Sequence, residues 1–176
     1  MKNLILSSIC LALVMPLVAF RTAKPLAPVD VTELTISKIH LAYKMGQFTS
    51  EQLVAAYLDR ISQFDKQINS ITTINPDALS IAKELDEEYK RTKVLRPLHG
   101  IPIIVKDNIN TKGLPTTAGA ISLQNFAPDT DAFIIEKLVK AGAIIIAKSN
   151  MAEWAFTPWN SFSSLHGTTL NPYNLE

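Results

Sequence analysis

The 176 residues are 47% hydrophobic and 19% charged, which is enough apolar sequence for one compact globular domain and too little for two large ones. Lysine and arginine number 17 against 16 aspartates and glutamates, and no long run of one charge occurs. A nucleic-acid partner is therefore not expected. The one cysteine, Cys10, lies in the first hydrophobic stretch, so a chain without that stretch could form neither a disulfide nor a thiolate metal site.

The N-terminus has the organisation of a secretory signal peptide. Lys2 gives a small positive region, residues 4–17 are almost continuously apolar, and Ala19 is a small residue suited to cleavage. An uncleaved anchor helix is the alternative, but the apolar stretch is short for a membrane span and contains Pro16. We therefore expect a signal peptide over residues 1–19, a secreted or periplasmic mature chain, and no stable membrane insertion after cleavage.

The next residues predict an arm followed by a helix. Residues 20–30 carry two prolines and no apolar periodicity, which indicates a linker or an extended arm, and the folded part is expected over residues 31–176. Apolar residues from Leu34 to Met45 recur at helical spacing, and Gly46 can end that helix in a left-handed conformation.

A second helix and a short strand follow. Thr49 and Gln52 have the spacing of a capping box, and an apolar stripe continues from there to Phe64. The β-branched run at residues 71–74 predicts a strand.

A third helix is expected next. Asn75 offers a capping side chain and Pro76 suits the first helical position, and the helix should run to about Thr92.

The second half of the chain predicts a βαβ unit. Residues 101–109 read IPIIVKDNI and begin with an apolar run, a turn-rich stretch follows, residues 131–141 show helical spacing, and residues 143–148 form a second apolar run. Neither run alternates with polar residues, as expected of parallel strands that helices cover on both faces. The fold class is therefore α/β.

Lys106 stands at the end of the first of these strands. Open α/β sheets place their ligand-binding crevices at the carboxyl ends of strands. Burial there would favour the neutral amine, which can accept a proton, although Asp107 beside it would oppose this. By position alone, a solvated strand end is the more common role for such a lysine.

Longer motifs surround this lysine. The sequence reads LHGIPIIVKDNINTKGLPTTAG at 98–119, DAFIIEKLVKAGAIIIAKSNMAEWAF at 131–156 and NPYN at 171–174. Together these stretches closely resemble the amidase-signature family. The resemblance covers residues 31–176 but only the N-terminal third of a typical relative. It implies the N-terminal part of an amidase-signature fold, with helices followed by parallel strands of a mixed sheet and helices on both faces.

The resemblance also implies a chemistry. The lysine that ends the first strand in this family is the general base, and the matching residue is Lys106. A Ser-cisSer-Lys triad would hydrolyse a carboxamide C–N bond: the lysine takes a proton through a bridging serine, and a second serine attacks the carboxamide carbon. A covalent acyl-enzyme follows, and backbone N–H groups stabilise the oxyanion. The resemblance implies a small-molecule amide as substrate, with no metal and no cofactor.

The serines of that triad are expected outside the 176 residues. In this family a glycine-flanked serine block follows the NP segment, which begins here at Asn171. Ser163 and Ser164 precede that segment and lie between Phe162 and Leu165, so we expect them to be loop residues. The chain is accordingly expected to be an N-terminal fragment of a secreted amidase that is inactive alone.

Two aromatic residues are candidates for substrate binding. The family shapes its acyl pocket with the segment after the second strand, which implies Trp154 and Phe156, although ordinary cores use the same side chains. His99 and His166 each adjoin a glycine and have no neighbours at metal-ligand spacing, so neither a catalytic nor a metal role is expected. The resemblance leaves open the oligomeric state and the choice among small, peptide and fatty acyl amides. Export argues against aminoacyl-tRNA transamidation.

A non-enzymatic interpretation also stands: an exported binding module, or a decaying open reading frame derived from an amidase. The two interpretations differ in expected stability, because apolar parallel strands need neighbours on both edges and helices on both faces. If the chain is an amidase fragment, residues 20–176 alone should fold poorly or aggregate. A sharp, cooperative thermal transition with monomeric elution would instead favour the binding module.

Overall fold

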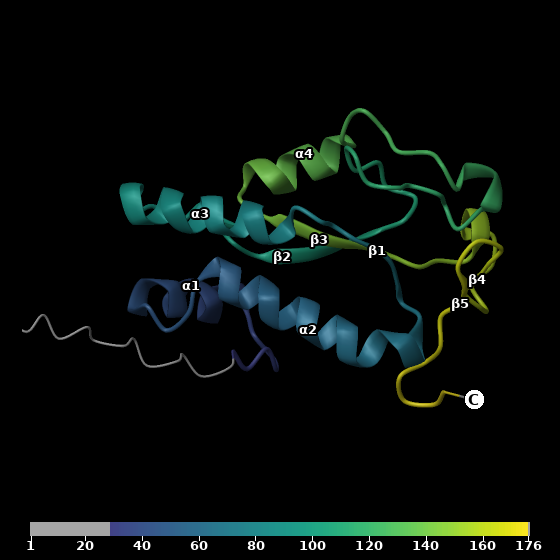
Figure 1. The fold of residues 1–176 in the computed structure, drawn as a ribbon, viewed down its shortest axis with the longest axis horizontal. Helices are drawn as coiled ribbons and strands as arrows, with labels where there is room; N and C mark the ends of the chain where they lie inside the picture. The colour runs from purple at the N-terminus through teal and green to yellow at the C-terminus, as the bar shows by residue number, and fades with distance from the viewer. Residues whose placement is uncertain (1–28, 176) are drawn as a thin grey trace, which may run out of the picture.

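The computed structural model describes residues 29–175 (Figure 1). The signal peptide and most of the arm expected over residues 1–30 therefore lie outside the described residues. The elements follow in the order α1 (Ile36–Met45), α2 (Ser50–Ile68), β1 (Ile71–Ile74), α3 (Ala78–Thr92), β2 (Pro102–Lys106), η1 (Ile121–Leu123), α4 (Phe133–Lys140), β3 (Ile144–Ser149), η2 (Glu153–Ala155), β4 (Phe162–Ser163) and β5 (Gly167–Thr168). Within residues 29–175, none of the helices has both the length and the apolar character needed to span a bilayer.

Local sequence signals set the ends of the first two helices. Gly46 closes α1 in a left-handed conformation with φ of 66°, as predicted. The Thr49 side chain accepts the Gln52 backbone N–H, and the Gln52 side chain accepts the Thr49 backbone N–H. The predicted capping box at the start of α2 is thus confirmed, and β1 covers the predicted residues 71–74.

Helix α3 begins later than the sequence predicts. The Asn75 side chain accepts the Asp77 backbone N–H at 3.0 Å and donates to the Ile145 carbonyl oxygen at 2.7 Å. The Asn75 side chain therefore links the turn before the helix to strand β3, and the helix starts only at Ala78. The prediction that Pro76 takes the first helical position is wrong, whereas the predicted end at Thr92 is confirmed.

The βαβ unit is confirmed. The three-stranded sheet has the order β1-β3-β2, with β2 parallel to β3 and β1 antiparallel to β3. Helix α4 makes the crossover between the two parallel strands. In Figure 1, α4 lies on one side of the sheet and α2 on the other.

Strand β3 is buried on both faces because its side chains alternate between two cores. Ile144 and Ile146 pack with residues of α2 and α3, while Ile145 packs with Val105 and with residues of α4. The unbroken apolar run thus reflects helices on both faces, as predicted. Strand β2 is one of the two outer strands of the described sheet and is covered less well, so Ile104 stays 44% exposed.

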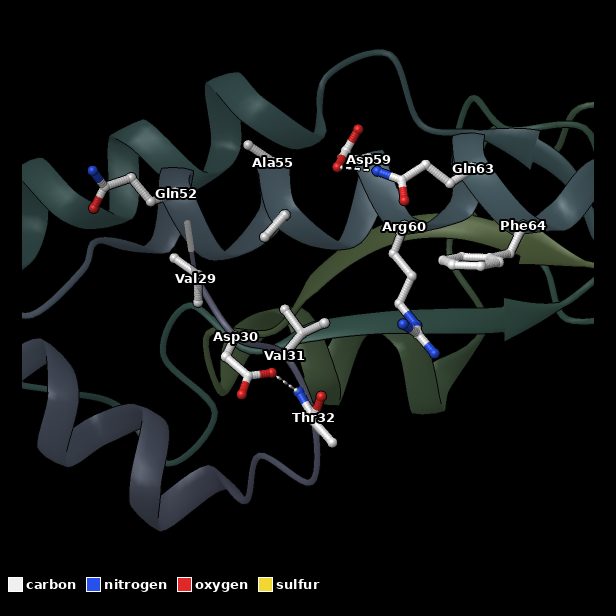
Figure 2. A pocket seen from close by; sticks show the side chains of 11 residues that line it. Val29, Asp30, Val31, Thr32, Gln52, Ala55, Asp59, Arg60, Gln63 and Phe64 are labelled. Carbon is white, nitrogen blue, oxygen red and sulfur yellow. Dashed lines mark hydrogen bonds between the residues drawn. The ribbon is translucent and has the colours of Figure 1, made fainter. Parts of the chain in front are cut away.

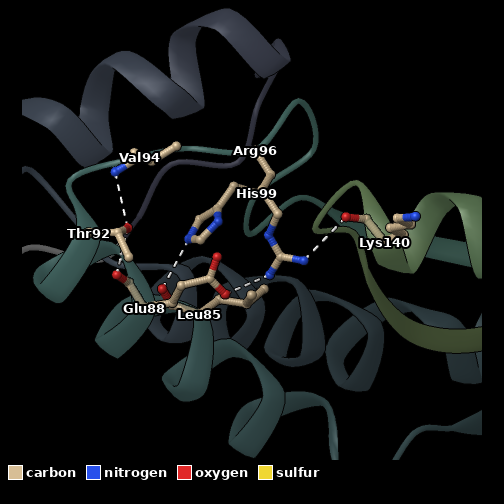
Figure 3. Close-up of polar contacts among 7 residues, drawn as sticks. All are labelled: Leu85, Glu88, Thr92, Val94, Arg96, His99 and Lys140. Carbon is tan, nitrogen blue, oxygen red and sulfur yellow. Dashed lines mark hydrogen bonds and ion pairs between the residues drawn. The ribbon is translucent and has the colours of Figure 1, made fainter.

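Polar contacts bind the segment before β2 to helix α3 (Figure 3). The Arg96 guanidinium donates to the Glu88 carboxylate at 2.8 Å and to the Lys140 carbonyl oxygen at 3.3 Å. The buried His99 ring donates through Nε2 to the Leu85 carbonyl oxygen at 3.0 Å. Gly142, with φ of 99°, passes so close that an added Cβ would lie 2.7 Å from the His99 Cα. These contacts hold the start of β2 beside the start of β3.

The end of the arm packs against the folded part. Val29 and Val31 contact the apolar cluster formed by α1, α2 and Ile101. Figure 2 shows the shallow groove between this segment and α2, where the Arg60 guanidinium lies 5.1 Å from the centre of the Phe64 ring.

Candidate active site

Lys106 is the last residue of β2 and lies at the carboxyl end of the parallel pair. It is in register with Ser149 of β3. The chain turns immediately after it: the Asp107 N–H donates to the Ser149 carbonyl oxygen at 3.2 Å, and the Ile109 N–H donates to the Lys106 carbonyl oxygen at 3.0 Å. The Lys106 residue itself is exposed, so the burial that would favour its neutral amine is not found among the described residues. The backbone is thus firmly held while the amine is left at the surface, where a substrate could reach it.

Asp107 does the opposite and points into the protein, where it is 1% exposed. Its carboxylate accepts the Thr117 N–H at 3.2 Å, the Gly119 N–H at 3.3 Å and a short hydrogen bond from the Thr117 hydroxyl. The TTAG stretch is therefore folded back onto the residue that follows Lys106. The carboxylate organises this loop through donors that lie ten and more residues along the chain.

A second strand-end lysine, Lys148, is fully buried at 0% exposure and was missed as a site residue from sequence. Its Nζ donates to the Ile109 carbonyl oxygen at 2.6 Å, to the Thr116 hydroxyl at 3.0 Å and to the Thr111 hydroxyl at 3.4 Å. All three acceptors belong to the loop after Lys106. The available signal was the repeat of one pattern, because both IPIIVK and AIIIAK are apolar strands that end in lysine.

The two lysines leave their strands on opposite faces of the sheet. Val105 pairs with Lys148 and Lys106 pairs with Ser149. The pairing passes from Ile103 with Ile145 to Ile104 with Ala147, so a β-bulge in β3 interrupts the alternation of its side chains. Beyond the bulge Lys148 shares the face of its partner Val105, which packs toward α4. Burial lowers the pKa of Lys148 to about 8, and the negative charge of Asp107 opposes that shift.

The β4–β5 hairpin packs against the loop through Ser163. This serine is 1% exposed; its hydroxyl donates to the Gly119 carbonyl oxygen at 2.6 Å and accepts the His166 N–H at 2.9 Å. Ser163 lies in β4, so the expectation that it is a loop residue is wrong. Ser164 lies in the following turn, where its hydroxyl accepts the Ile121 N–H at 3.1 Å. Both hydroxyls have structural partners.

Trp154 and Phe156 lie at the surface, 58% and 90% exposed. The Trp154 N–H donates to the Ala118 carbonyl oxygen at 2.9 Å, so η2 is docked on the loop that Asp107 organises. In this structure neither ring packs in a core. Their exposure leaves them available to contact a ligand or further polypeptide.

Among residues 29–175, no group of three or more histidines, cysteines, aspartates and glutamates is arranged to hold a metal ion. The site instead consists of the exposed Lys106 at the end of β2 and of two buried charged groups nearby, the Asp107 carboxylate and the Lys148 ammonium.

The sequence model of the amidase family matches residues 52–176. This chain belongs to the amidase family. Among curated relatives of this amidase chain, a glutamyl-tRNA(Gln) amidotransferase polypeptide of Lawsonia intracellularis is 44% identical over 144 residues, which cover 81% of the chain and 29% of the relative.

Solved structures agree on the fold. The native peptide amidase of Stenotrophomonas maltophilia matches with a TM-score of 0.77 and 37% identity, over 82% of this amidase chain and 31% of that protein. An amidase family protein of Bacillus anthracis matches with a TM-score of 0.75 and 38% identity, over 82% and 30% of the two chains. The prediction of an N-terminal portion of the amidase-signature fold is confirmed. The chain spans about 30% of the length of these relatives.

Lys148 gives the stability of this amidase chain a specific pH dependence. Its pKa is about 8 in the folded protein and near 10.5 when solvated, so above pH 8 the unfolded state binds more protons than the folded state. The free energy of unfolding should therefore gain about 2 kcal/mol from this group between pH 8 and pH 10. Below pH 8 the cost of burying the ammonium is present in full.

Chemical denaturation of the full-length protein at pH 7 to 10 measures this gain, and the Lys148→Met variant should lack it. The window ends at pH 10 because burial raises the pKa of Tyr43 and of Tyr57, which lowers stability once unfolded tyrosines ionise. If wild type and variant show parallel pH dependence, Lys148 is not buried as an ammonium.

Proposed function

We propose that this chain supplies the general base of an exported amidase that hydrolyses carboxamide C–N bonds, and that Lys106 is this base. The observation that carries the proposal is the contrast between the two strand-end lysines. The Lys148 ammonium is enclosed by three acceptor oxygens. Lys106 is exposed at the carboxyl end of the parallel strands, on a backbone that hydrogen bonds hold in place.

In the proposed reaction the Lys106 amine accepts a proton from a bridging serine, which in turn accepts the proton of an attacking serine. The attacking oxygen bonds to the carboxamide carbon, and the C–N bond then breaks as the proton returns to the leaving nitrogen. Water hydrolyses the resulting ester by the reverse proton path. Charge on the tetrahedral oxygen requires backbone N–H donors aimed at it.

Both serines are proposed to lie outside the 176 residues. The match to relatives over only 29% to 31% of their length supports this, because most of a relative's sequence has no counterpart here. The structural hydrogen bonds of the Ser163 and Ser164 hydroxyls also support it. On this proposal the 176 residues have no amidase activity by themselves.

The proposed substrate is a small carboxamide, with Trp154 and Phe156 beside its acyl part. The near-equal numbers of basic and acidic residues, 17 and 16, give little attraction for a polyanion such as tRNA. The exposed rings offer apolar surface to an acyl chain or an aromatic group.

Replacing Lys106 by alanine in the full-length protein should lower kcat for release of ammonia from a peptide amide by at least about 100-fold, the usual contribution of a general base. The matched control is Lys112→Ala, which removes another exposed lysine, from the loop after Lys106, and should leave the rate unchanged. The thermal midpoint of both variants should match that of the wild type. Retention of activity in Lys106→Ala would refute the assignment.

Export of the protein is proposed from residues 1–19. Expressed in its own host, the mature protein should be found outside the cytoplasm, and mass spectrometry should place its new N-terminus close after Ala19. A deletion of residues 2–19 should retain the protein inside the cell. A chain that keeps Met1 and stays in the cytoplasm would contradict both the signal peptide and the location.

A further inference from the structure

The buried Lys148 ammonium lies at the centre of the loop that follows Lys106. The side chain comes from β3, yet its three acceptors are the Ile109 carbonyl and the hydroxyls of Thr111 and Thr116. These contacts join positions separated by 32 to 39 residues. A buried charge that lacked such partners would cost several kcal/mol, so the loop and the lysine depend on each other.

A short chain of hydrogen bonds leads from Lys148 to Lys106. The Ile109 peptide carbonyl accepts the Lys148 ammonium at 2.6 Å, and the Ile109 N–H donates to the Lys106 carbonyl oxygen at 3.0 Å. The residue that connects the two lysines is therefore held from both sides. Charge-assisted hydrogen bonds are shorter and stronger than neutral ones, which makes the first of these contacts the firmer anchor.

The other end of the loop is also fixed by hydrogen bonds to a buried charged side chain. Thr116 accepts Lys148 through its hydroxyl, and the adjacent Thr117 donates its N–H and its hydroxyl to the Asp107 carboxylate. Two opposite charges, Asp107 and Lys148, thus hold neighbouring residues of one loop. Residues 107–119 are clamped at both ends around the turn that begins at Lys106.

Lys148 cannot itself act as the base in this arrangement. An ammonium has three N–H donors, and three acceptor oxygens surround this one. The side chain is also at 0% exposure, so a substrate could reach it only after the loop opened.

We infer that Lys148 is a positioning residue, which fixes the backbone of Lys106 by clamping residues 109–116 against strand β3. The inference deepens the proposed function, since its catalytic consequence rests on Lys106 being the base. The clamp itself is a property of the fold that can be measured without any assay of activity.

The test compares Lys148→Met with Lys140→Met in the full-length protein. Methionine is unbranched and nearly as long as lysine but has no donor, while Lys140 is exposed and lies on α4 outside the loop. Hydrogen exchange of the backbone amides of residues 107–119 should become at least about tenfold faster in Lys148→Met. The amides of α2 should be unchanged, and Lys140→Met should behave like the wild type.

Kinetics provide the second readout. With a peptide amide as substrate, Lys148→Met should lower kcat by about 10-fold to 100-fold and change KM little, because a displaced base weakens the chemical step more than substrate binding. Lys106→Ala should lose activity without any change in loop exchange. A mobile loop in Lys148→Met together with an inactive wild-type protein would sink the proposed function and leave the clamp standing.

Unchanged exchange of residues 107–119 in Lys148→Met would overturn the inference. If that variant does not fold, the same exchange measurement on Thr116→Val tests the inference. This substitution removes one of the three acceptors of Lys148 and keeps the shape of the side chain. Faster exchange confined to the loop in Thr116→Val supports the clamp, and exchange equal to the wild type overturns it.

Discussion

A buried ammonium must be surrounded by oxygen atoms, and this requirement shapes the active-site half of the chain. Lys148 is at 0% exposure at the end of the central strand, so the carbonyl and hydroxyl groups that satisfy it have to come from nearby polypeptide. Residues 109–116 supply them. The path of the loop after β2 is therefore set by a charge on β3, and the position of Lys106 follows from that path.

The pleat of the sheet gives two similar strand ends different functions. Lys106 is the last residue of β2 and Lys148 is the last but one of β3, and they lie on opposite faces because they are offset by one position in the parallel register. One face is closed by α4 and the loop, so its lysine becomes a fixed structural cation. The other lysine stays exposed, so its side chain is accessible to further polypeptide or to a ligand.

Local signals predicted most of the fold. The Thr49 capping box, the left-handed Gly46 and the unbroken apolar strands act over a few residues, and the structure has all of them. The predicted start of α3 was wrong because the Asn75 side chain binds β3, a contact between residues far apart in the sequence. Lys148 was missed for the same reason, since its burial depends on acceptors more than thirty residues away. The predictions for Lys106, Trp154 and Phe156 came from the family resemblance and stay predictions.

The central claim is that Lys148 is held as a buried ammonium behind Lys106, and an NMR titration of the lysine side chains tests it directly. With lysine labelled at Nζ and Cε, the account predicts one resonance with a midpoint near pH 8 that is absent from Lys148→Met, well below the usual value of 10.5. Its ammonium protons should also exchange slowly with solvent at neutral pH. If the resonance lost in Lys148→Met titrated near 10.5 and exchanged freely, the ammonium would be solvated and the loop would need another anchor.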